Sequence, residues 1–569
     1  MYAEIYENWL KNTINNKEIN DELISVNGNL EEISDRFYKE LDFGTAGLRG
    51  VIGAGTNRMN IYTVGRATQA LANYVLSVSD SPSVAIAYDS RINSTLFAET
   101  AAAILAVNGI KVFIYTELMP TPMLSFAVRD LKCDAGIVIT ASHNPAKYNG
   151  YKVYGPDGCQ LAPDAAQNIM EMMQNIDCFD GVKFGDFNCL LASSQIEYIG
   201  DNVIENYLTA VEKQSINGKN LNMSDFSVIY TPIHGTGNKP VREILRRIGV
   251  KNVTVVKEQE LPDGNFPTAP YPNPEIKQPF ELALQLANKI SADILLATDP
   301  DADRVGIAVN HNGEFVLMTG NDVGALLLNY ILECRTANGT LPKKPIAVKT
   351  IVTTELCQKI ADHYGCELIN VLTGFKFIGE QIAILEEKCE EERYIFGFEE
   401  SYGYLSGGYV RDKDAVVASM LICEMAAYYK KQGLTLVAKL EELFEKHGYY
   451  INKQKSFAFE GQSGMKKMDE IMTNLRTKAP KTFAGSEIAF VEDYLASKRY
   501  DKINSTESDI TLPKSNVLVF GLKNNCKVIF RPSGTEPKIK VYIGAVDISV
   551  AAAEKNIDLI ANDASILMK

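Results

Sequence analysis

The stretch Ala135-Gly-Ile-Val-Ile-Thr-Ala-Ser-His-Asn-Pro145 joins an apolar, β-branched run to small polar residues and a proline, and Lys147-Tyr-Asn-Gly-Tyr-Lys152 follows it. This pattern predicts a buried strand that delivers Ser142 to a loop at the strand end. A serine hydroxyl alone is a poor nucleophile and a poor metal ligand, so its neighbours matter. The ordinary interpretation is a polar loop. The acidic and phosphate-type motifs elsewhere in the chain favour a functional one.

Strands and helices alternate around this stretch. Strands are predicted at Val84–Tyr88 and Val112–Tyr115, with one helix between them and a second from about Thr121. Such alternation indicates a parallel sheet covered by helices. Ligands bind at the carboxyl ends of the strands in sheets of this kind, where Asp89-Ser-Arg91 and Ser142 would lie.

The same alternation recurs twice, which favours internal duplication. One repeat runs into an acidic loop after Ala297, and the other runs into Gly397-Phe-Glu-Glu-Ser401. The proline-rich segment Leu261–Pro274 is predicted to be a connection and little else. After Gly448 the pattern changes to that of a smaller α+β domain. We therefore expect four domains, at residues 1–205, 206–320, 321–447 and 448–569.

Length and composition agree with a multidomain globular protein. A chain of 569 residues should hold roughly three to five domains at about 100–200 residues each. The net charge of −14 argues against nucleic-acid or anionic-membrane partners, so an anionic substrate must meet a local positive patch. Ten scattered cysteines and an N-terminus without a signal pattern favour free thiols in a reducing cytoplasm. The apolar stretch Ala415–Tyr429 is too short to span a bilayer.

Two loops carry charged groups in distinctive patterns. In Asp299-Pro-Asp-Ala-Asp303 three carboxylates repel one another unless a cation neutralises them. Oxygen ligands without His or Cys suit Mg²⁺, Mn²⁺ or Ca²⁺, and Arg304 could contact an anion bridged by that metal. In Arg531-Pro-Ser-Gly-Thr-Glu-Pro-Lys538 a guanidinium, two hydroxyls and backbone N–H groups form a nest for a tetrahedral dianion. An acidic solvated turn and a proline-glycine turn are the competing interpretations.

Two further segments carry weaker signals. Gly397-Phe-Glu-Glu-Ser401 offers hydrogen-bond acceptors of the kind that hold sugar hydroxyls. Leu41-Asp-Phe-Gly-Thr-Ala-Gly-Leu-Arg-Gly50 is interpreted either as a glycine turn with a solvated Arg49 or as a segment that aims Arg49 at an anion. We interpret His234 as a packed loop histidine without a catalytic role.

Together these loops resemble the signature of the α-D-phosphohexomutase superfamily. Thr140–Pro145 is similar to its phosphoserine loop, Asp299–Arg304 to its metal loop, Gly397–Ser401 to its sugar-recognition loop and Arg531–Lys538 to its phosphate-binding loop. The four motifs occur in the family's order and the resemblance covers nearly the whole chain. The long N-terminal arm and the Glu-Glu-Ser sequence resemble the phosphoglucomutase and phosphopentomutase branch.

The resemblance implies three α/β domains with mixed sheets and a C-terminal α+β domain around a central cleft. It implies a phosphoserine at Ser142, one Mg²⁺ per chain held by Ser142, Asp299, Asp301 and Asp303, and transfer of the phosphoryl group to a sugar phosphate. We expect Lys152, His143 and Arg49 to serve catalysis, with Lys152 as general acid or base. The substrate-binding residues expected from the family motifs are Glu399, Ser401, Lys376, Arg304, Arg531, Ser533, Gly534 and Thr535.

The expected reaction interconverts glucose 1-phosphate and glucose 6-phosphate, with glucose 1,6-bisphosphate as intermediate and activator. A phosphopentomutase or phosphomannomutase of the same superfamily remains open, as do a sugar-phosphate phosphatase and a binding protein without catalysis. We expect sugar phosphates as the partners, no nucleic acid or membrane, a monomer or homodimer, and a cytoplasmic location.

Overall fold

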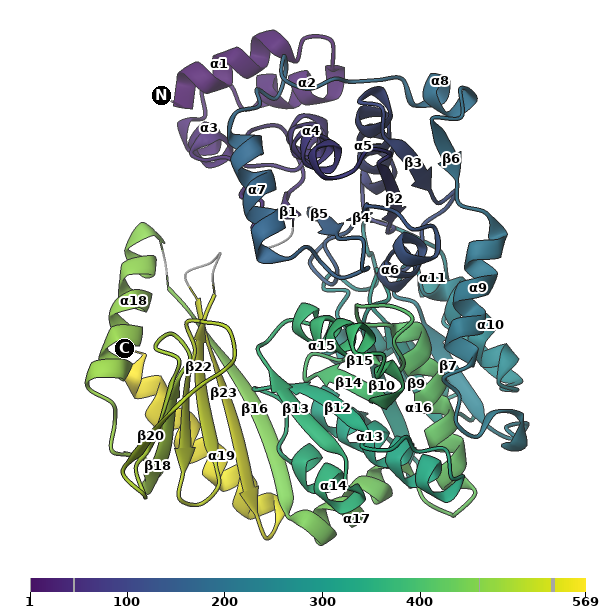
Figure 1. The fold of residues 1–569 in the computed structure, drawn as a ribbon, viewed down its shortest axis with the longest axis vertical. Coiled ribbons are helices and arrows are strands. Elements are labelled where there is room, and N and C mark those ends of the chain that lie inside the picture. The colour runs from purple at the N-terminus through teal and green to yellow at the C-terminus, as the bar shows by residue number, and fades with distance from the viewer. Residues whose placement is uncertain (1, 45–46, 460, 534–537, 569) are drawn as a thin grey trace. The chain divides into compact units, whose positions relative to one another are not determined.

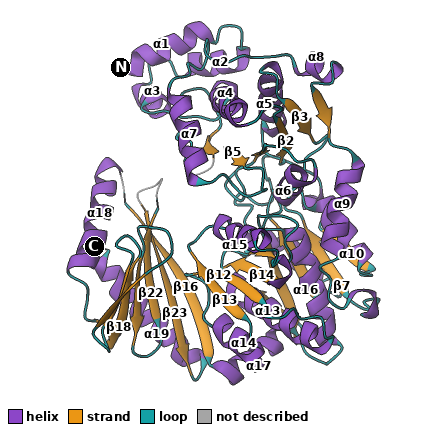
Figure 2. Cartoon of the chain, viewed as in Figure 1, coloured by secondary structure: helices purple, strands orange, loops and turns teal. Residues whose placement is uncertain are grey.

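A computed structural model describes residues 2–44, 47–459, 461–533 and 538–568 (Figure 1). The chain forms two compact units. The first unit contains residues 1–318, 378–394 and 402–428, and the second contains residues 319–377, 395–401 and 429–569. Helices and strands alternate through most of both units, and the last part of the second unit is dominated by one large sheet (Figure 2).

The sequence predicts that the N-terminal arm, residues 1–40, is helical, and in the structure this arm consists of three helices. These are α1 (Tyr2–Asn12), α2 (Lys17–Ser25) and α3 (Leu30–Phe37). Asn16 and Asn29 cap α2 and α3 by accepting backbone N–H groups of the first turn. Trp9 and Phe37 are buried in a small aromatic cluster, with ring centroids 5.8 Å apart. This cluster gives the arm a hydrophobic core of its own.

A six-stranded sheet with the strand order β1-β5-β4-β2-β3-β6 follows the arm. Strands β4, β2, β3 and β6 are parallel, and β5 is antiparallel to both β4 and β1. The strands are β1 (Gly47–Val51), β2 (Ser83–Tyr88), β3 (Lys111–Ile114), β4 (Ala135–Ile139), β5 (Tyr148–Tyr154) and β6 (Ile196–Tyr198). The helices are α4 (Ile61–Val78), α5 (Ser94–Val107), α6 (Thr121–Asp130), α7 (Pro163–Gln174), α8 (Phe187–Ala192) and α9 (Asp201–Glu212).

The edge of this sheet differs from the prediction in two places. Arg49 lies on strand β1, which begins at Gly47, and Lys152 lies on strand β5, and neither segment was predicted to be a strand. Gly47 pairs with Lys152 across the two strands. A Cβ atom at Gly47 would lie 1.8 Å from the Tyr151 carbonyl oxygen, so the glycine permits the strands to approach.

The second sheet of the first unit has the order β11-β10-β9-β7-β8. Strands β9 and β10 form an antiparallel hairpin in which Thr298 pairs with Val305, so residues 299–304 make up its loop. The apolar spacing of the sequence predicts one helix over Ile276–Ile290, and the structure has a short 3₁₀ turn followed by a helix that ends at Ala287. The elements are η1 (Gly218–Asn220), β7 (Ser227–Thr231), α10 (Asn238–Arg247), β8 (Asn252–Val255), α11 (Lys257–Glu260), η2 (Gln278–Phe280), α12 (Glu281–Ala287), β9 (Ile294–Thr298), β10 (Val305–His311) and β11 (Glu314–Met318).

The first part of the second unit contains a sheet in which β12 lies between β13 and β14, and β12 and β13 are parallel. Its elements are α13 (Gly320–Ala337), β12 (Ile346–Thr350), α14 (Leu356–Tyr364), β13 (Glu367–Val371), η3 (Glu391–Arg393), β14 (Tyr394–Glu399) and α17 (Leu436–His447). The chain crosses between the units here, and most of α15 (Lys376–Glu387), β15 (Gly403–Leu405) and α16 (Ala415–Lys430) belong to the first unit.

The C-terminal part of the second unit is an eight-stranded antiparallel sheet with α18 and α19. The polar stretch at residues 500–508, which had no predicted strand, contributes to the hairpin of β19 and β20. The elements are β16 (Tyr449–Ala458), α18 (Gly461–Thr477), β17 (Thr482–Phe483), β18 (Ser486–Asp493), β19 (Lys498–Asp501), β20 (Thr506–Asp509), β21 (Leu518–Leu522), β22 (Lys527–Pro532), β23 (Lys538–Asp547) and α19 (Val550–Leu567). Among the described residues, none of the helices has the length and apolarity that crossing a membrane requires.

Candidate active site

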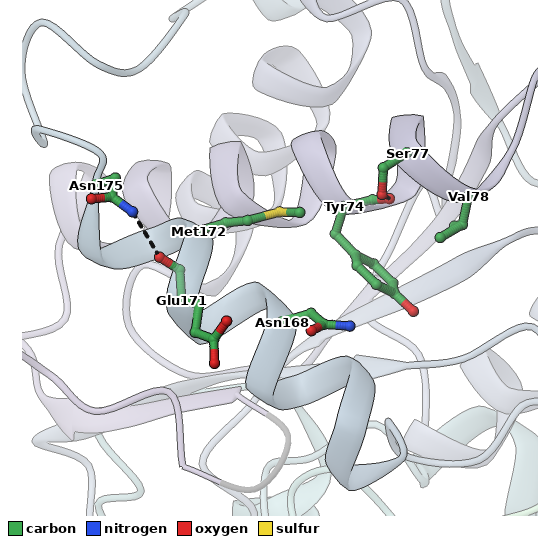
Figure 3. Close-up of a pocket in the computed structure, with 7 residues that line it drawn as sticks. All are labelled: Tyr74, Ser77, Val78, Asn168, Glu171, Met172 and Asn175. Atoms are coloured by element: carbon green, nitrogen blue, oxygen red, sulfur yellow. Dashed lines mark hydrogen bonds between the residues drawn. The ribbon is translucent and has the colours of Figure 1, made fainter.

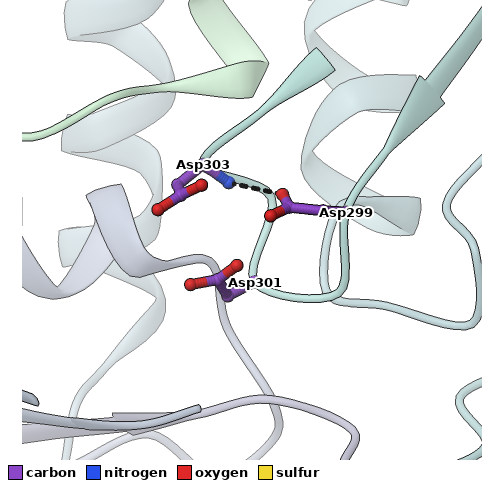
Figure 4. A group of neighbouring side chains, drawn as sticks. All are labelled: Asp299, Asp301 and Asp303. Atoms are coloured by element: carbon purple, nitrogen blue, oxygen red, sulfur yellow. Dashed lines mark hydrogen bonds between the residues drawn. The ribbon is translucent and has the colours of Figure 1, made fainter. Parts of the chain in front are cut away.

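The three aspartates of the β9–β10 loop converge on one point (Figure 4). Asp299, Asp301 and Asp303 are all buried, and one carboxylate oxygen from each lies within 4.8 Å of the others. The loop is held from within, because Asp299 Oδ1 accepts the backbone N–H groups of Asp303 at 3.1 Å and Arg304 at 3.0 Å. The three acids that alternate in the sequence thus form a buried cluster and not a solvated turn.

The charge of this cluster demands compensation. Burial, with the negative charges of Asp301 and Asp303, raises the pKa of Asp299 well above its ordinary value. Burial also opposes ionisation of Asp301, but the Lys152 ammonium outweighs it and lowers the pKa of that carboxyl. The Oδ1 atoms of Asp301 and Asp303 are buried and accept no hydrogen bond from the described residues. Buried carboxylate oxygens that accept no hydrogen bond, within a group of three converging acids, fit a hard cation.

Ser142 lies directly against the acidic cluster. Its Oγ donates a hydrogen bond to Asp299 Oδ2 at 3.1 Å and lies 3.2 Å from His143 Nδ1. The residue is buried and has a φ of +52°, which is unusual for any residue other than glycine. Thr140 Oγ1 accepts the Ser142 N–H at 2.8 Å. The structure therefore brings the predicted serine and the predicted acids together, although they are 157 residues apart.

The Ser142 loop is held by the buried ion pair of Asp89 and Arg91. The sequence predicts that these residues lie at a strand end but gives them no role. Asp89 lies at the end of β2, where its Oδ2 accepts a hydrogen bond from Thr140 Oγ1 at 2.7 Å and pairs with Arg91 Nε at 3.3 Å. The Arg91 guanidinium donates to the backbone carbonyls of Ser142, Asn144, Pro145 and Tyr148. One side chain thus organises the loop from Ser142 to the start of β5.

Two lysines flank the aspartates. Lys152 Nζ lies 3.0 Å from Asp301 Oδ2 and 3.9 Å from Asp303 Oδ2. Lys413 Nζ lies 3.1 Å from Asp303 Oδ2 and 3.0 Å from Asp412 Oδ1. Lys413 was missed by sequence reasoning. Its signal is the run Arg411-Asp-Lys-Asp414, four charged residues placed immediately before the apolar helix α16, and all four are buried.

His143 is surrounded by positive charge. Burial lowers the pKa of its imidazole well below the ordinary value, and the charges of Arg304 and Arg49 lower it further. A neutral ring can orient a neighbouring group by hydrogen bonding but has no proton to spare as an acid. Arg304 is itself held by acids, because it forms an ion pair with Glu275 and its Nε lies 3.6 Å from Asp303 Oδ1.

The remaining described candidates lie in the second unit. Glu399 Oε1 accepts the Gly374 N–H at 2.8 Å, which ties the end of β14 to the Thr373-Gly-Phe-Lys376 segment. Ser401 follows this strand, and Lys376 begins α15. In the last sheet Arg531 lies on β22, and its Nη1 donates to the Tyr542 hydroxyl at 3.4 Å.

Burial and then the negative charge of Glu400 raise the Tyr542 pKa, so the Glu399–Ser401 loop lies within electrostatic range of the strands that carry Arg531. The Ser533 N–H donates to the Lys538 carbonyl at 2.7 Å. The predicted phosphate contacts at Gly534 and Thr535 lie outside the described residues.

Comparison with known proteins places this chain among enzymes of one family. The models of phosphoglucomutase/phosphomannomutase α/β/α domains I, II and III match residues 40–178, 205–313 and 319–447. The phosphoglucomutase of Staphylococcus saprophyticus is 38% identical over 513 residues, which are 90% of this chain and 92% of that protein. The chain belongs to this family. The resemblance to the α-D-phosphohexomutase superfamily is thereby confirmed.

Other family members agree in sequence and in fold. A phosphoglucomutase of Staphylococcus aureus strain bovine RF122 is 39% identical and covers 90% of this chain and 91% of its own length. The crystal structure of parafusin, a Paramecium phosphoglucomutase in its open form, superimposes with a TM-score of 0.66 at 18% identity and covers 93% of this chain and 95% of that one. That likeness shows the shared phosphohexomutase fold, with three α/β domains and a C-terminal domain.

A separate surface cavity of about 320 Å³ lies between α4 and α7 (Figure 3). It is lined by Tyr74, Ser77, Val78, Asn168, Glu171, Met172 and Asn175. Glu171 is its single ionisable carboxylate, and its backbone carbonyl accepts a hydrogen bond from Asn175 at 3.2 Å. None of the candidate catalytic residues lines this cavity, so we do not assign it to the family's reaction.

Proposed function

We propose that this chain is a phosphoglucomutase that interconverts glucose 1-phosphate and glucose 6-phosphate. The observation that carries the proposal is the buried hydrogen bond between Ser142 Oγ and Asp299, in a group of three acids that suits a divalent cation. The alignment with curated phosphoglucomutases over 90% of the chain supports it. In this proposal Ser142 carries a phosphoryl group, and glucose 1,6-bisphosphate is both intermediate and activator.

The proposed cofactor is one Mg²⁺ per chain, with Asp299, Asp301, Asp303 and an oxygen on Ser142 as ligands. When bound it supplies neutralisation of the charge on the transferring phosphoryl group. The Oδ1 atoms of Asp301 and Asp303, which are buried and accept no hydrogen bond from the described residues, support this ligand set. Lys152 and Lys413 add positive charge on two sides of the acids, and Arg304 adds a planar donor that suits phosphate oxygens.

The proposed step is transfer of the phosphoryl group from Ser142 Oγ to the free hydroxyl of the sugar phosphate. The bond from Ser142 Oγ to phosphorus breaks while the sugar oxygen forms the new one, and the hydroxyl proton passes through Lys152 to the Ser142 oxygen. The bisphosphate then turns around, and its other phosphoryl group returns to Ser142 by the reverse step. His143 orients the serine, and Arg49 adds positive charge beside it.

The second unit is proposed to bind the parts of the substrate that do not react. Glu399 and Ser401 would accept and donate hydrogen bonds to two adjacent sugar hydroxyls, with Lys376 beside them. Arg531, Ser533, Gly534 and Thr535 would hold the distal phosphate. We also retain the division into four domains at residues 1–205, 206–320, 321–447 and 448–569. The cytoplasmic location and the monomeric or homodimeric state stay predictions.

A coupled assay of the purified protein with Mg²⁺ and a trace of glucose 1,6-bisphosphate tests the proposal. Glucose, mannose, glucosamine and ribose 1-phosphates are compared, with Ser142→Ala as the inactive control. We expect kcat/KM to be highest for glucose 1-phosphate. A value at least about tenfold higher for mannose or ribose 1-phosphate, or release of phosphate without isomer, would contradict the glucose assignment.

A further inference from the structure

The proline-rich segment between α11 and η2 does more than connect them, contrary to the sequence prediction. Phe266 is fully buried, and its ring centroid lies 5.0 Å from the Arg91 guanidinium carbon. Gly264 packs so closely on the chain at Ser90–Ile92 that a Cβ atom there would lie 2.5 Å from the Ile92 nitrogen. The first half of the segment is therefore anchored to the residues that organise the Ser142 loop.

The second half is anchored to the strand that follows the acidic loop. The Pro274 carbonyl packs on Gly306 of β10, where a Cβ atom would lie 2.2 Å from that oxygen. Asn273 Oδ1 accepts the Glu275 N–H at 3.0 Å. Between the two anchors, the Thr268 hydroxyl lies 2.9 Å from His234 Nε2. The Thr268 carbonyl accepts a hydrogen bond from Gln278 Nε2 at 2.8 Å. The backbone at Glu275 is thus fixed relative to β10.

Glu275 uses this fixed position to form an ion pair with Arg304 Nη1. The Nε edge of the same guanidinium faces Asp303 at 3.6 Å. Two acids at different nitrogens restrict both the reach and the plane of a long side chain that otherwise keeps many rotamers. Asp299 Oδ1 accepts the Arg304 N–H at 3.0 Å and Asp299 Oδ2 accepts a hydrogen bond from Ser142 Oγ at 3.1 Å, so one carboxylate joins the Arg304 backbone to the Ser142 loop.

We propose that Glu275 is a positioning residue that holds the Arg304 guanidinium in the orientation needed to contact the phosphoryl group on Ser142. This inference rests on the proposed phosphoglucomutase function. Asp303 already lies beside the same guanidinium, and without Glu275 a full ion pair there would draw Arg304 onto a carboxylate of the acidic cluster. Glu275 therefore both orients Arg304 and keeps it from competing for that carboxylate.

A series of variants tests the inference in the full-length protein with Mg²⁺ and glucose 1-phosphate. Glu275→Ala should lower kcat about 10- to 100-fold, the range typical of residues that orient groups around a metal site, while KM changes little. Glu275→Gln keeps an acceptor oxygen and should restore most of kcat. Glu281→Gln, at an exposed acid that begins α12, is the matched control and should behave as wild type.

A double-mutant cycle separates positioning from a general structural effect. In an Arg304→Met background, Glu275→Ala should cause no further loss of kcat, because its effect passes through Arg304. A wild-type kcat for Glu275→Ala, or the same additional loss in both backgrounds, would overturn the inference. Wild-type turnover is measured first. Its absence contradicts the proposed function and the inference with it, whereas an active wild type with an unaffected Glu275→Ala variant contradicts the inference alone.

Discussion

Ser142 occupies a backbone conformation that costs free energy. A non-glycine residue in the left-handed region is less stable by about 1–3 kcal/mol and persists only where its surroundings hold it. Here the holders are identifiable: Thr140 accepts the Ser142 N–H, and the buried Arg91 binds the Ser142 carbonyl. The strain places the hydroxyl against Asp299, which is the arrangement that a phosphorylated serine beside a cation requires.

Phosphorylation of Ser142 is the first prediction at this scale. Intact mass and peptide mapping of the wild type should locate one phosphoryl group on Ser142, and Ser142→Ala should lose it together with turnover. The exposed Ser77→Ala variant is the control and should keep both. The melting temperature of Ser142→Ala should stay close to that of the wild type, since a loop hydroxyl contributes little to stability. A phosphoryl group mapped consistently to another residue would contradict the assignment.

Lys413 gives the second prediction. It is the cation between two buried carboxylates, Asp303 and Asp412, so its removal leaves charge uncompensated in the interior. Lys413→Met should lower the free energy of unfolding by about 3–5 kcal/mol and reduce turnover. Lys413→Arg keeps the charge and should lose less stability. Denaturant unfolding of both variants checks this, and equal losses for Met and Arg would mean that side-chain shape matters more than charge.

At the scale of elements, the loops that carry chemistry were predictable because each follows an apolar run. Strands β4 and β9 are fully buried, and their runs of β-branched and aliphatic residues predict them directly. Strands β1 and β5 were not predicted as strands. Both contain glycine, and β5 also contains Asn149, residue types that are depleted in strands. Pairing on both sides, with β4 and β1, overrides the local preference of β5.

The same limit explains why Lys413 and Glu275 were missed. Their partners, Asp303 and Arg304, are far away in sequence, and no local periodicity reports an ion pair across such a separation. Ser142 and the acids were found because each lies in a motif of its own. That these motifs act together came from the family resemblance and not from pattern alone.

Strand β22 and the loop after it provide the third prediction. Arg531 is proposed to hold the distal phosphate, and binding energy from that remote group positions the reacting end. Arg531→Ala should therefore raise KM and also lower kcat. Lys523→Ala, an exposed cation preceding the same strand and paired with Glu487, is the matched control. Steady-state kinetics of both variants check this. An unchanged KM for Arg531→Ala would place the phosphate elsewhere.

At the scale of the whole molecule, the net negative charge of the chain does not describe the distribution of charge at the candidate site. The chain carries −14 overall, yet the candidate site gathers Lys152, Lys413 and Arg304 around its acids. Composition predicts that an anionic substrate needs local cations, and this stays a prediction. Composition could not locate them, because the three cations come from β5, from the β9–β10 loop and from the segment before α16.

The last prediction links the acidic cluster to the stability of the protein. Without a cation, burial and two neighbouring acids disfavour the charged form of Asp299 and so raise its pKa. The proposed Mg²⁺ would bind only the folded cluster, so at about a hundredfold excess over its Kd it should stabilise the wild type by about 2.7 kcal/mol. Asp299→Asn removes one of the repelling charges and can keep the acceptor for the Asp303 and Arg304 N–H groups.

Asp299→Asn should therefore melt at the same temperature as the chelated wild type or above it, should gain nothing from Mg²⁺, and should be inactive. Thermal melts of both proteins with Mg²⁺ and with a chelator measure the two effects separately. Asp293→Asn is not a suitable control, because Asp293 accepts the Ser227 N–H at the start of the same sheet. The exposed Asp469→Asn in α18 is preferable. A Mg²⁺-induced rise in melting temperature that survives in Asp299→Asn would place the cation outside this cluster.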